Sequence, residues 1–212
     1  MGAGSTNSLT AAEIAAGWRM LFDGTTLDGW RGFTTVEPPP SWKPVDGTLL
    51  RVADGGDLMT VDQYADFELE LEWKVPPAGN SGIMFRVTGQ GARTHETGPE
   101  LQVLDNAGHP DSKDPRTTAG ANYALHAPVR DVTRPAGEWN AVRLVVKGAH
   151  VEHWMNGEKL LEYELWSADW EARVKASKFA AWPGYGRARR GHIVLQDHGD
   201  AVAFRNIRIR PR

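Results

Sequence analysis

The chain has 212 residues, with 24 Lys and Arg against 27 Asp and Glu, a formal net charge of −3 and no cysteine. The lack of cysteine excludes disulfides, thiol nucleophiles and thiolate metal sites. The evenly mixed charge argues against nucleic-acid binding, which gathers Lys and Arg on one face. No apolar run approaches the ~20 residues that a membrane-spanning helix needs.

The first residues carry neither a charged segment nor an apolar one, so they do not form an intact signal peptide. We interpret residues 1–9 as a leader or vector-derived tail and residues 10–212 as a single domain. Thr10 and Glu13 have the spacing of a capping box, and Gly17 is a suitable stop signal. This pattern predicts one short N-terminal helix of about two turns.

From there the pattern is that of β-strands. Val45–Thr48 reads as a tight turn between strands Trp42–Val45 and Leu49–Val52. Apolar residues alternate strictly with charged ones from Phe67 to Val75, which is typical of a half-buried strand. Asn156 and Gly157 are the strongest hairpin signal in the chain. Further strands are expected at Ile83–Val87, Glu100–Leu104, Trp139–Lys147, Val151–Met155, Lys159–Tyr163, Ile193–Gln196 and Val202–Arg210.

Ten to twelve short strands at this spacing predict an all-β fold, an antiparallel β-sandwich or jelly roll. Two longer stretches, Asn106–Thr118 and Trp166–Arg190, are expected to be irregular loops of the kind that carries function. The nine Trp fit a protein that stacks indole rings on sugars, although most Trp in a sandwich belong to the core.

Carboxylates alternate at Glu68, Glu70 and Glu72. A retaining glycosidase needs two carboxyl groups ~5–5.5 Å apart, close to the spacing of alternate residues on one strand face. The opposite face is fully apolar and the series continues into Lys74, so a solvated outer face is the simpler interpretation.

Two other strands place polar residues on one face. Glu100 and Gln102 share a face opposite Leu101 and Val103, and Gln196 shares one with His198 at a strand end. An imidazole there is suited to proton transfer near neutral pH. Each pair fits a cleft wall or an ordinary exposed or structural position.

Arg86 lies in an otherwise apolar strand, so it needs either a structural ion pair or a ligand. His109 lies in a loop with Asp105, Asp111 and Asp114, which makes a divalent metal a candidate cofactor. An acidic loop is more often simply solvated, and no cofactor is certain from the sequence.

Several segments together resemble the 3-keto-disaccharide hydrolase domain family. The resemblance runs from about Gly17 to Ile209, and its specificity comes from the order of the motifs. These are Gly17–Trp30, Asn80–Arg86, Glu100–Asp105, Gly137–Asn140, His153–Gly157, Gly191–Gly199 and Val202–Ile207.

The resemblance implies a concanavalin A-like jelly roll of the lectin and glucanase type. It also implies cleavage of 3-keto glycosides or 3-keto disaccharides, by hydrolysis or by elimination of the C1 substituent followed by addition of water. Such a site needs a base for the C2 proton, a donor or metal at the C3 oxygen and an acid for the leaving group.

Carried onto this chain, the resemblance assigns catalysis to His198, Glu100 and Arg86. In this hypothesis His198 is a general base or acid, Glu100 is its counterpart or a metal ligand, and Arg86 stabilises the enolate or orients Glu100. Substrate binding is assigned to Gln102, Gln196 and Asp105 from these motifs, with Tyr123 and Lys178 as secondary candidates on the rim.

Three other functions fit the same sequence. One is a non-catalytic, lectin-like carbohydrate-binding module, and another is a conventional glycosidase that uses Glu68 and Glu70. The third is a structural or interaction domain whose polar residues at strand ends form internal ion pairs. The family resemblance also implies a small carbohydrate substrate, a sugar 3-dehydrogenase as functional partner, and a periplasmic or exported location, with the cytoplasm as the alternative. Oligomeric state stays open.

Overall fold

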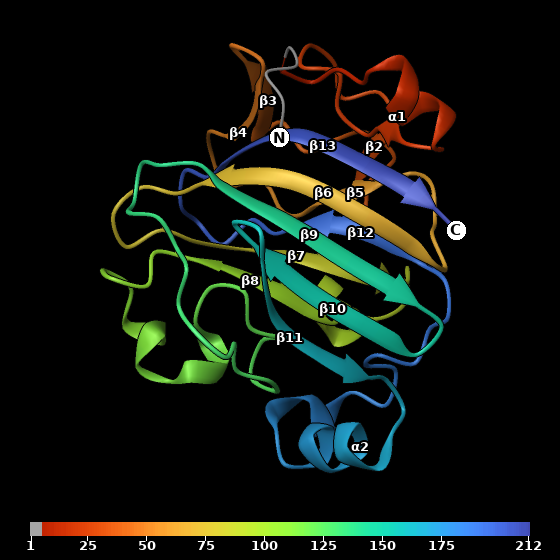
Figure 1. Cartoon of the computed structure of the whole chain (residues 1–212), viewed down its shortest axis with the longest axis vertical. Helices are drawn as coiled ribbons and strands as arrows, with labels where there is room; N and C mark the ends of the chain where they lie inside the picture. Colours follow the sequence, from red (N-terminus) through yellow and green to blue (C-terminus); the bar gives the residue numbers. More distant parts are fainter. Residues whose placement is uncertain (1–5) are drawn as a thin grey trace.

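The computed structural model describes residues 6–212 and shows two antiparallel sheets packed face to face (Figure 1). The larger sheet has eight strands in the order β11-β10-β9-β6-β13-β4-β3, with β1 added beside β13. The smaller has five, in the order β2-β5-β12-β7-β8. This is the expected β-sandwich, of the jelly-roll type.

The strands of the larger sheet are β1 (Arg19–Met20), β3 (Trp42–Val45), β4 (Thr48–Arg51), β6 (Phe67–Lys74), β9 (Asn140–Lys147), β10 (His150–Met155), β11 (Glu158–Glu164) and β13 (Ala203–Pro211). Those of the smaller sheet are β2 (Trp30–Gly32), β5 (Leu58–Thr60), β7 (Asn80–Val87), β8 (Glu100–Leu104) and β12 (His192–Leu195).

Both hairpins predicted from turn chemistry are confirmed. Asp46 and Gly47 join β3 to β4, and Asn156 and Gly157 join β10 to β11. All four residues have φ between 48° and 87°. Positive φ at both central positions is what a two-residue type I′ turn requires, and Asn, Asp and Gly adopt it most readily.

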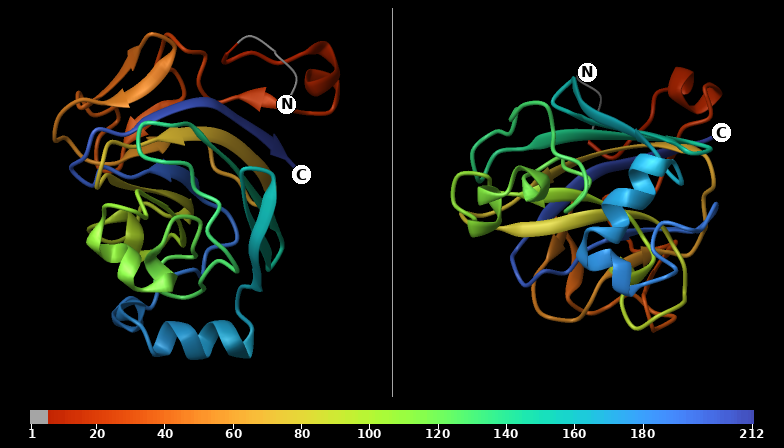
Figure 2. Two further views of the ribbon diagram at one scale, coloured as in Figure 1. Left: turned by 60° about the vertical axis from the view of Figure 1, so that its left-hand side comes forward. Right: turned by 90° about the horizontal axis from the view of Figure 1, so that it is seen from below.

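The N-terminal helix α1 (Ala11–Ala15) forms with the predicted capping box between Thr10 and Glu13. The stretch expected to be an irregular loop after β11 instead contains a second helix, α2 (Ala168–Lys175), followed by the 3₁₀ turn η4 (Lys178–Ala181). Ser167 caps α2, because its hydroxyl accepts from the Trp170 N–H. Figure 2 shows α2 at the opposite end of the sandwich from α1.

The core lies between the two sheets. Phe67, Leu71 and Trp73 from β6 meet Phe85 and Leu101 from the smaller sheet in one buried cluster. The alternation seen in the sequence therefore follows the pleat: every second residue faces the core.

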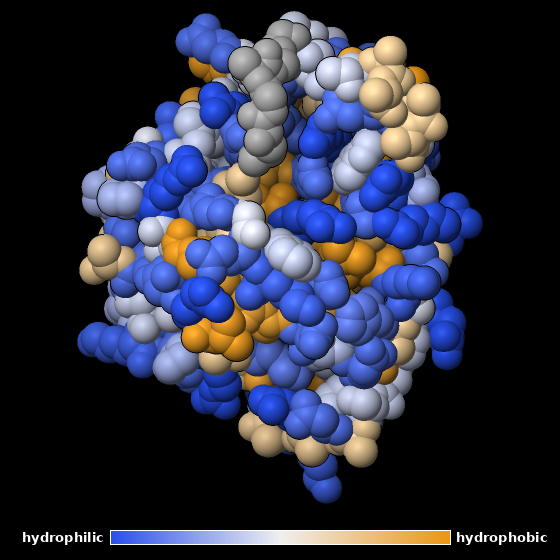
Figure 3. Space-filling view, in the orientation of Figure 1, coloured by the Kyte–Doolittle hydropathy of each residue, from blue (hydrophilic) through white to orange (hydrophobic). Residues whose placement is uncertain are grey.

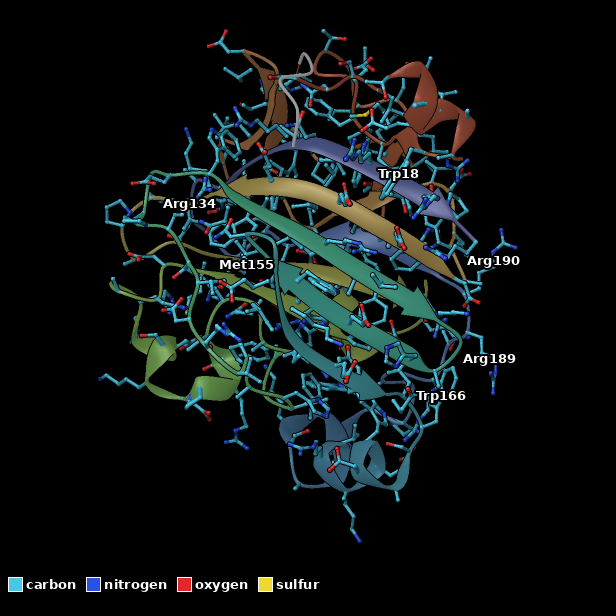
Figure 4. The ribbon with its side chains drawn as sticks, in the orientation of Figure 1. Trp18, Arg134, Met155, Trp166, Arg189 and Arg190 are labelled. Carbon is cyan, nitrogen blue, oxygen red and sulfur yellow. The ribbon has the colours of Figure 1, made fainter. Side chains whose placement is uncertain are left out.

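The outer face of the larger sheet is charged. Glu70 pairs with Arg208, and Glu72 pairs with Arg205. Indole rings lie among these pairs, such as Trp18 beside β13 with Arg208 above its ring (Figure 4). Figure 3 shows this face as largely hydrophilic, with small apolar areas.

At the N-terminus, Asn7 is bound to the sandwich although sequence reasoning placed it in a tail. Its N–H donates to Asn206 Oδ1 at 2.7 Å, and its Nδ2 donates to the Gly47 carbonyl at 2.7 Å. The part of the predicted tail before residue 6 lies outside the described residues. Within residues 6–212, none of the helices has the length and apolar character needed to cross a membrane.

Candidate active site

A cleft of about 680 Å³ lies on the outer face of the smaller sheet. This volume is within the range of about 300–1,000 Å³ typical of small-molecule sites. Strands β7 and β8 and the residues directly after β12 line one side. The surrounding loops contribute segments 32–40, 55–57 and 92–95, and the 3₁₀ turn η4 contributes Lys178.

Glu100 is the most strongly perturbed acid of the cleft. It begins β8, opposite Met84 of β7, and only 5% of its surface is exposed. Its carboxyl group occupies space that a side chain on Gly82 would otherwise fill. Burial raises the pKa of Glu100 to about 8, with the charge of Lys178 acting in the opposite direction. Glu100 is therefore largely protonated at neutral pH.

Lys178 and Tyr123 lie together beside Glu100. The Tyr123 N–H donates to the Glu100 carbonyl at 3.0 Å, and Lys178 Nζ lies 4.4 Å from the centre of the Tyr123 ring. Burial, together with the charge of Glu100, raises the pKa of Tyr123 to about 12, so its hydroxyl remains a donor.

Lys178 is held in place by a stack of buried rings behind it. Phe179 stacks on Tyr185 with 3.8 Å between ring centres, and Tyr185 stacks on Trp170 of α2 at 5.9 Å. The Ser177 hydroxyl accepts from the Phe179 N–H and starts the turn η4. The segment after β11 thus presents an ammonium group to the cleft from outside both sheets.

His95 faces the cleft from η1 (Thr94–Glu96). Its ring packs edge-on against Trp182, with ring centres 5.2 Å apart. Burial lowers the pKa of His95, and the nearby cations of Lys178 and Arg93 lower it further. His95 is therefore a neutral imidazole at pH 7, able to accept a proton.

Asp57 connects this turn to the end of β12. It accepts a hydrogen bond from the Thr94 hydroxyl and another from the Asp197 N–H at 2.8 Å. Burial raises the pKa of Asp57. Asp197 is itself fixed by Arg51 Nε at 2.6 Å and by the Gly56 N–H at 2.9 Å. The network ties the segments that carry His95 and His198 to one loop.

Three amides and a histidine complete the wall. Gln102 pairs with Gly82 across β7 and β8, and the Gln196 N–H donates to the Gly82 carbonyl at 2.9 Å. Asn80 lies two residues before Gly82 and so shares its face. The Asn80 Nδ2 lies 3.5 Å from Nε2 of His198, an exposed residue on the rim.

Six of the eight residues assigned from sequence therefore line one cleft: Glu100, Gln102, Tyr123, Lys178, Gln196 and His198. The other two, Arg86 and Asp105, do not.

Arg86 lies at an irregularity in the β7–β12 pairing and has a φ of 51°. Such a bulge redirects a side chain that simple alternation would place beside Met84. Its guanidinium instead donates to the Ala65 carbonyl at 2.8 Å and pairs with Asp66 at 3.2 Å. Of the two partners considered for Arg86, the structure shows the ion pair.

Asp105 closes the turn after β8. Its Oδ2 accepts from the Ala78 N–H at 2.8 Å, and its Oδ1 accepts from the Ala107 N–H at 3.2 Å. These bonds account for an aspartate at this position without a ligand.

Glu68 and Glu70 lie on the larger sheet, away from the cleft. Glu68 pairs with Arg143, Arg210 and Arg212, and Glu70 pairs with Arg208. The hypothesis of a conventional glycosidase requires both carboxylates in a cleft. The structure contradicts this hypothesis.

The loop expected to be a candidate metal site does not gather its ligands. His109 Nδ1 accepts from the Asp111 N–H at 3.1 Å, and Asp114 is bidentate with Arg116. Within the described part of the chain, only His150, Glu152 and Glu162 bring three ligand atoms of His, Cys, Asp or Glu together. These three residues lie on β10 and β11. The ammonium group of Lys159 lies 2.8 Å from Glu162 and so supplies a positive charge to this group.

The comparisons with known proteins agree with this geometry. Residues 17–210 match the family described as a 3-keto-alpha-glucoside-1,2-lyase-like domain. The chain belongs to this family. It is 36% identical to a 3-keto-disaccharide hydrolase of Bacteroides thetaiotaomicron, over 97% of this chain and 84% of the relative. Membership classes the protein as a carbohydrate-active hydrolase.

Solved structures show the same fold. A Parabacteroides distasonis protein classed as a glycosyl hydrolase superposes with a TM-score of 0.91 and 34% identity, covering 98% of this chain and all of the other. A family 66 carbohydrate-binding module of Bacillus subtilis has a TM-score of 0.52 at 12% identity, covering 85% of this chain and 94% of its own. The second likeness concerns the fold alone.

Sequence reasoning missed His95, Asp57 and Asn80 as cleft residues. His95 and Asp57 lie in loops whose position depends on tertiary contacts, and no local spacing marks them. Asn80 had a usable signal: it precedes Gly82 by two residues on a strand, and therefore shares the face on which Gly82 leaves space.

Proposed function

We propose that this protein cleaves 3-keto glycosides by elimination across C1 and C2, followed by addition of water. The names of the family and of the Bacteroides relative support this substrate class. A ketone at C3 makes the C2 proton acidic, because the electron pair left behind is delocalised onto the C3 oxygen as an enolate.

The reaction has two proton transfers. A base removes the C2 proton to give the enolate, and collapse of the enolate forms the C1–C2 double bond while the C1–O bond breaks. An acid then protonates the departing oxygen. Addition of water across C1 and C2 restores a 3-keto sugar. The site must therefore hold one group that accepts a proton and another that donates one.

The observation that carries the proposal is that one cleft contains an acid and a base with pKa values displaced in opposite directions. Glu100 has a pKa raised to about 8 and is protonated, whereas His95 has a lowered pKa and is neutral. Both feel the charges of Lys178 and Asp57. Divergent environments of this kind identify acid and base partners. We assign Glu100 as the acid and His95 as the base.

Lys178 and Tyr123 supply the donors that the C3 oxygen of the enolate needs. An ammonium and a phenolic hydroxyl next to Glu100 are donors suited to the C3 oxygen as negative charge develops there. Arg86, which the sequence assigned to this task, points to Asp66 instead. Lys178 therefore takes the role of stabilising the enolate.

The first experiment compares aglycone release from a 3-keto glucoside with release from the unoxidised glucoside, each with and without EDTA. We expect release from the keto sugar alone. Saturable binding of either sugar without turnover would favour the lectin-like module instead. Loss of activity in EDTA would show that a metal takes part.

The assignment of the base is tested with His95→Ala and His198→Ala side by side. We expect the His95 variant to lose at least a hundredfold in kcat, within the ~10²–10⁴-fold range for general base catalysis. If only the His198 variant loses activity, the role predicted for His198 from sequence is correct and that of His95 is not.

Two further parts of the proposal concern context. A sugar 3-dehydrogenase would supply the substrate, because the C3 hydroxyl must be oxidised before C2 becomes acidic. An exported location remains a prediction, and fractionation of cells that produce the native protein tests it.

A further inference from the structure

Two buried amide oxygens in the cleft have no hydrogen-bond partner among the described residues: Oε1 of Gln102 and Oδ1 of Asn80. These residues are 1% and 2% exposed. A buried carbonyl without a partner costs free energy comparable to a lost hydrogen bond, so such atoms call for an explanation. Oε1 of Gln196, directly after β12, also has no partner among the described residues.

The orientation of two of these amides follows from their other contacts. The Gln102 Nε2 donates to the Thr117 carbonyl at 3.2 Å, and the Asn80 Nδ2 faces Nε2 of His198. Their NH₂ groups are thus engaged with the protein. Each NH₂ group has one such contact, whereas the oxygen of each amide has none, and an amide oxygen can only accept.

Two donors of the cleft, Tyr123 and Lys178, lie beside Glu100. Tyr123 is hydrogen-bonded through its backbone to Glu100, and Lys178 lies above the Tyr123 ring. Along the strands, Gln102 is two residues beyond Glu100, and Asn80 is two residues beyond Gly82. Each step of two residues advances about 6.6 Å. The two donors therefore lie at the level of Glu100, and the acceptors lie one or two such steps farther along the strands, a separation of about one or two sugar rings.

We propose that this division orients the substrate: the C3 ketone turns toward Lys178 and Tyr123, and free hydroxyl groups donate to Gln102, Asn80 and Gln196. The inference rests on the proposed function and adds a substrate requirement to it. A ketone has no proton to give, so the acceptor end cannot bind it. A hydroxyl can satisfy an orphaned carbonyl. Sugars lacking those hydroxyls, or carrying methyl ethers there, should bind more weakly.

A hard cation is the other ligand that amide oxygens could hold. Three features favour hydroxyl groups. Glu100, on the same strand as Gln102, is largely protonated at neutral pH and so brings little negative charge. The two amides with fixed orientation are spaced along strands rather than gathered on one loop. Lys178 also places a positive charge near the same acid.

The test measures binding rather than turnover. Calorimetry on the wild-type protein would compare an unoxidised glucoside with its 2-, 4- and 6-deoxy and O-methyl analogues. The same ligands would be titrated into Gln102→Met and Gln196→Met. Gln90→Met, an exposed residue outside the cleft, is the matched control.

We expect at least one deoxy analogue to bind about threefold to tenfold more weakly to the wild type, the effect of one neutral hydrogen bond. The amide variant that lost the partner of that hydroxyl should bind the parent and deoxy sugars equally. Because the deoxy series uses the wild-type protein, it decides the matter even if Gln102→Met does not fold.

Equal binding of all analogues by the wild type would overturn the inference. So would calcium binding that depends on Gln102 and Gln196. These results are separate from the proposed function: turnover of a 3-keto glycoside without any hydroxyl dependence would refute only the orientation. Hydroxyl-dependent binding without turnover would refute only the reaction.

Discussion

The carboxyl group of Glu100 occupies the position of the side chain that Gly82 lacks. A Cβ built on Gly82 would collide with Oε1 and Cδ of Glu100. The carboxyl group that we propose as the proton donor therefore packs against the backbone of the neighbouring strand. Substitution at position 82 should act on catalysis through Glu100.

We therefore expect Gly82→Ala to displace Glu100 and to lower kcat by at least tenfold. It should also destabilise the fold by about 1–3 kcal/mol, the usual cost of overpacking. Steady-state kinetics and thermal unfolding check both effects. Gly89→Ala is the control, because a Cβ there meets nothing within 4 Å. Wild-type activity in Gly82→Ala would show that Glu100 is free to move without loss.

Glu100→Gln should make the protein more stable at alkaline pH while abolishing catalysis. The pKa of Glu100 is raised from 4.5 to about 8 in the folded state, so the folded protein holds a proton that the unfolded chain has released. Wild-type stability is then lost as the pH rises from about 4.5 through 8. Glutamine does not ionise. The Tm difference between variant and wild type should grow across this range, and a constant difference would contradict the raised pKa.

The pH dependence of kcat/KM should be bell-shaped. The active form needs His95 neutral and Glu100 protonated. The rising limb should lie below pH 6.5, because the pKa of His95 is lowered, and the falling limb near pH 8. Glu100→Asp would test the second limb, since a shorter acid in the same place should move it. Activity that continues to rise beyond pH 9 would mean that Glu100 acts as a base.

Lys178→Met should lower kcat by about 10²–10³-fold, the typical loss of one oxyanion donor. KM should change less, because the charge that Lys178 meets develops only in the transition state. Lys175→Met, on the exposed face of α2, provides the control. A rise in KM with unchanged kcat would reduce Lys178 to a binding role.

Glu68→Gln should leave the kinetics unchanged and reduce stability at neutral pH by about 1–3 kcal/mol, the value of charge-assisted hydrogen bonds. Burial alone would raise the pKa of Glu68, but Arg210 and Arg143 more than offset this and hold it below 4.5. The stabilisation is present above the unfolded pKa and is lost as the pH falls through the folded value. Urea unfolding at pH 7 and pH 3 should show the difference between variant and wild type shrinking in acid.

Much of the fold could be predicted because it depends on short-range chemistry. The alternation of apolar and charged residues in β6 predicts a strand, and the Asn156–Gly157 pair predicts a hairpin, each without information from distant residues. Helix α2 was missed because the sequence of Trp166–Arg190 lacks a clear apolar period. Its helix is fixed by contacts such as Trp170 on Tyr185, which are 15 positions apart in the chain.

The cleft was partly predictable for the same reason. Glu100 and Gln102 lie on one strand face, which alternation reveals directly. Arg86 was assigned incorrectly to the neighbourhood of Glu100, because a bulge at positive φ reverses the face that alternation predicts. The position of His95 depends on the hydrogen bond between Thr94 and Asp57, whose loops meet only in the folded chain.

The place of β13 has a consequence for how the molecule forms. This strand, Ala203–Pro211, lies in the middle of the larger sheet, between β6 and β4. During synthesis, β6 and β4 leave the ribosome more than 120 residues before their shared neighbour. Until then, the edge of each strand that pairs with β13 has no partner. Pairings so distant in sequence are slow to form. The two halves of the sheet cannot join until residue 203 and beyond have emerged. The unpaired edges of β4 and β6 are therefore the places where a chaperone would act or aggregation would begin.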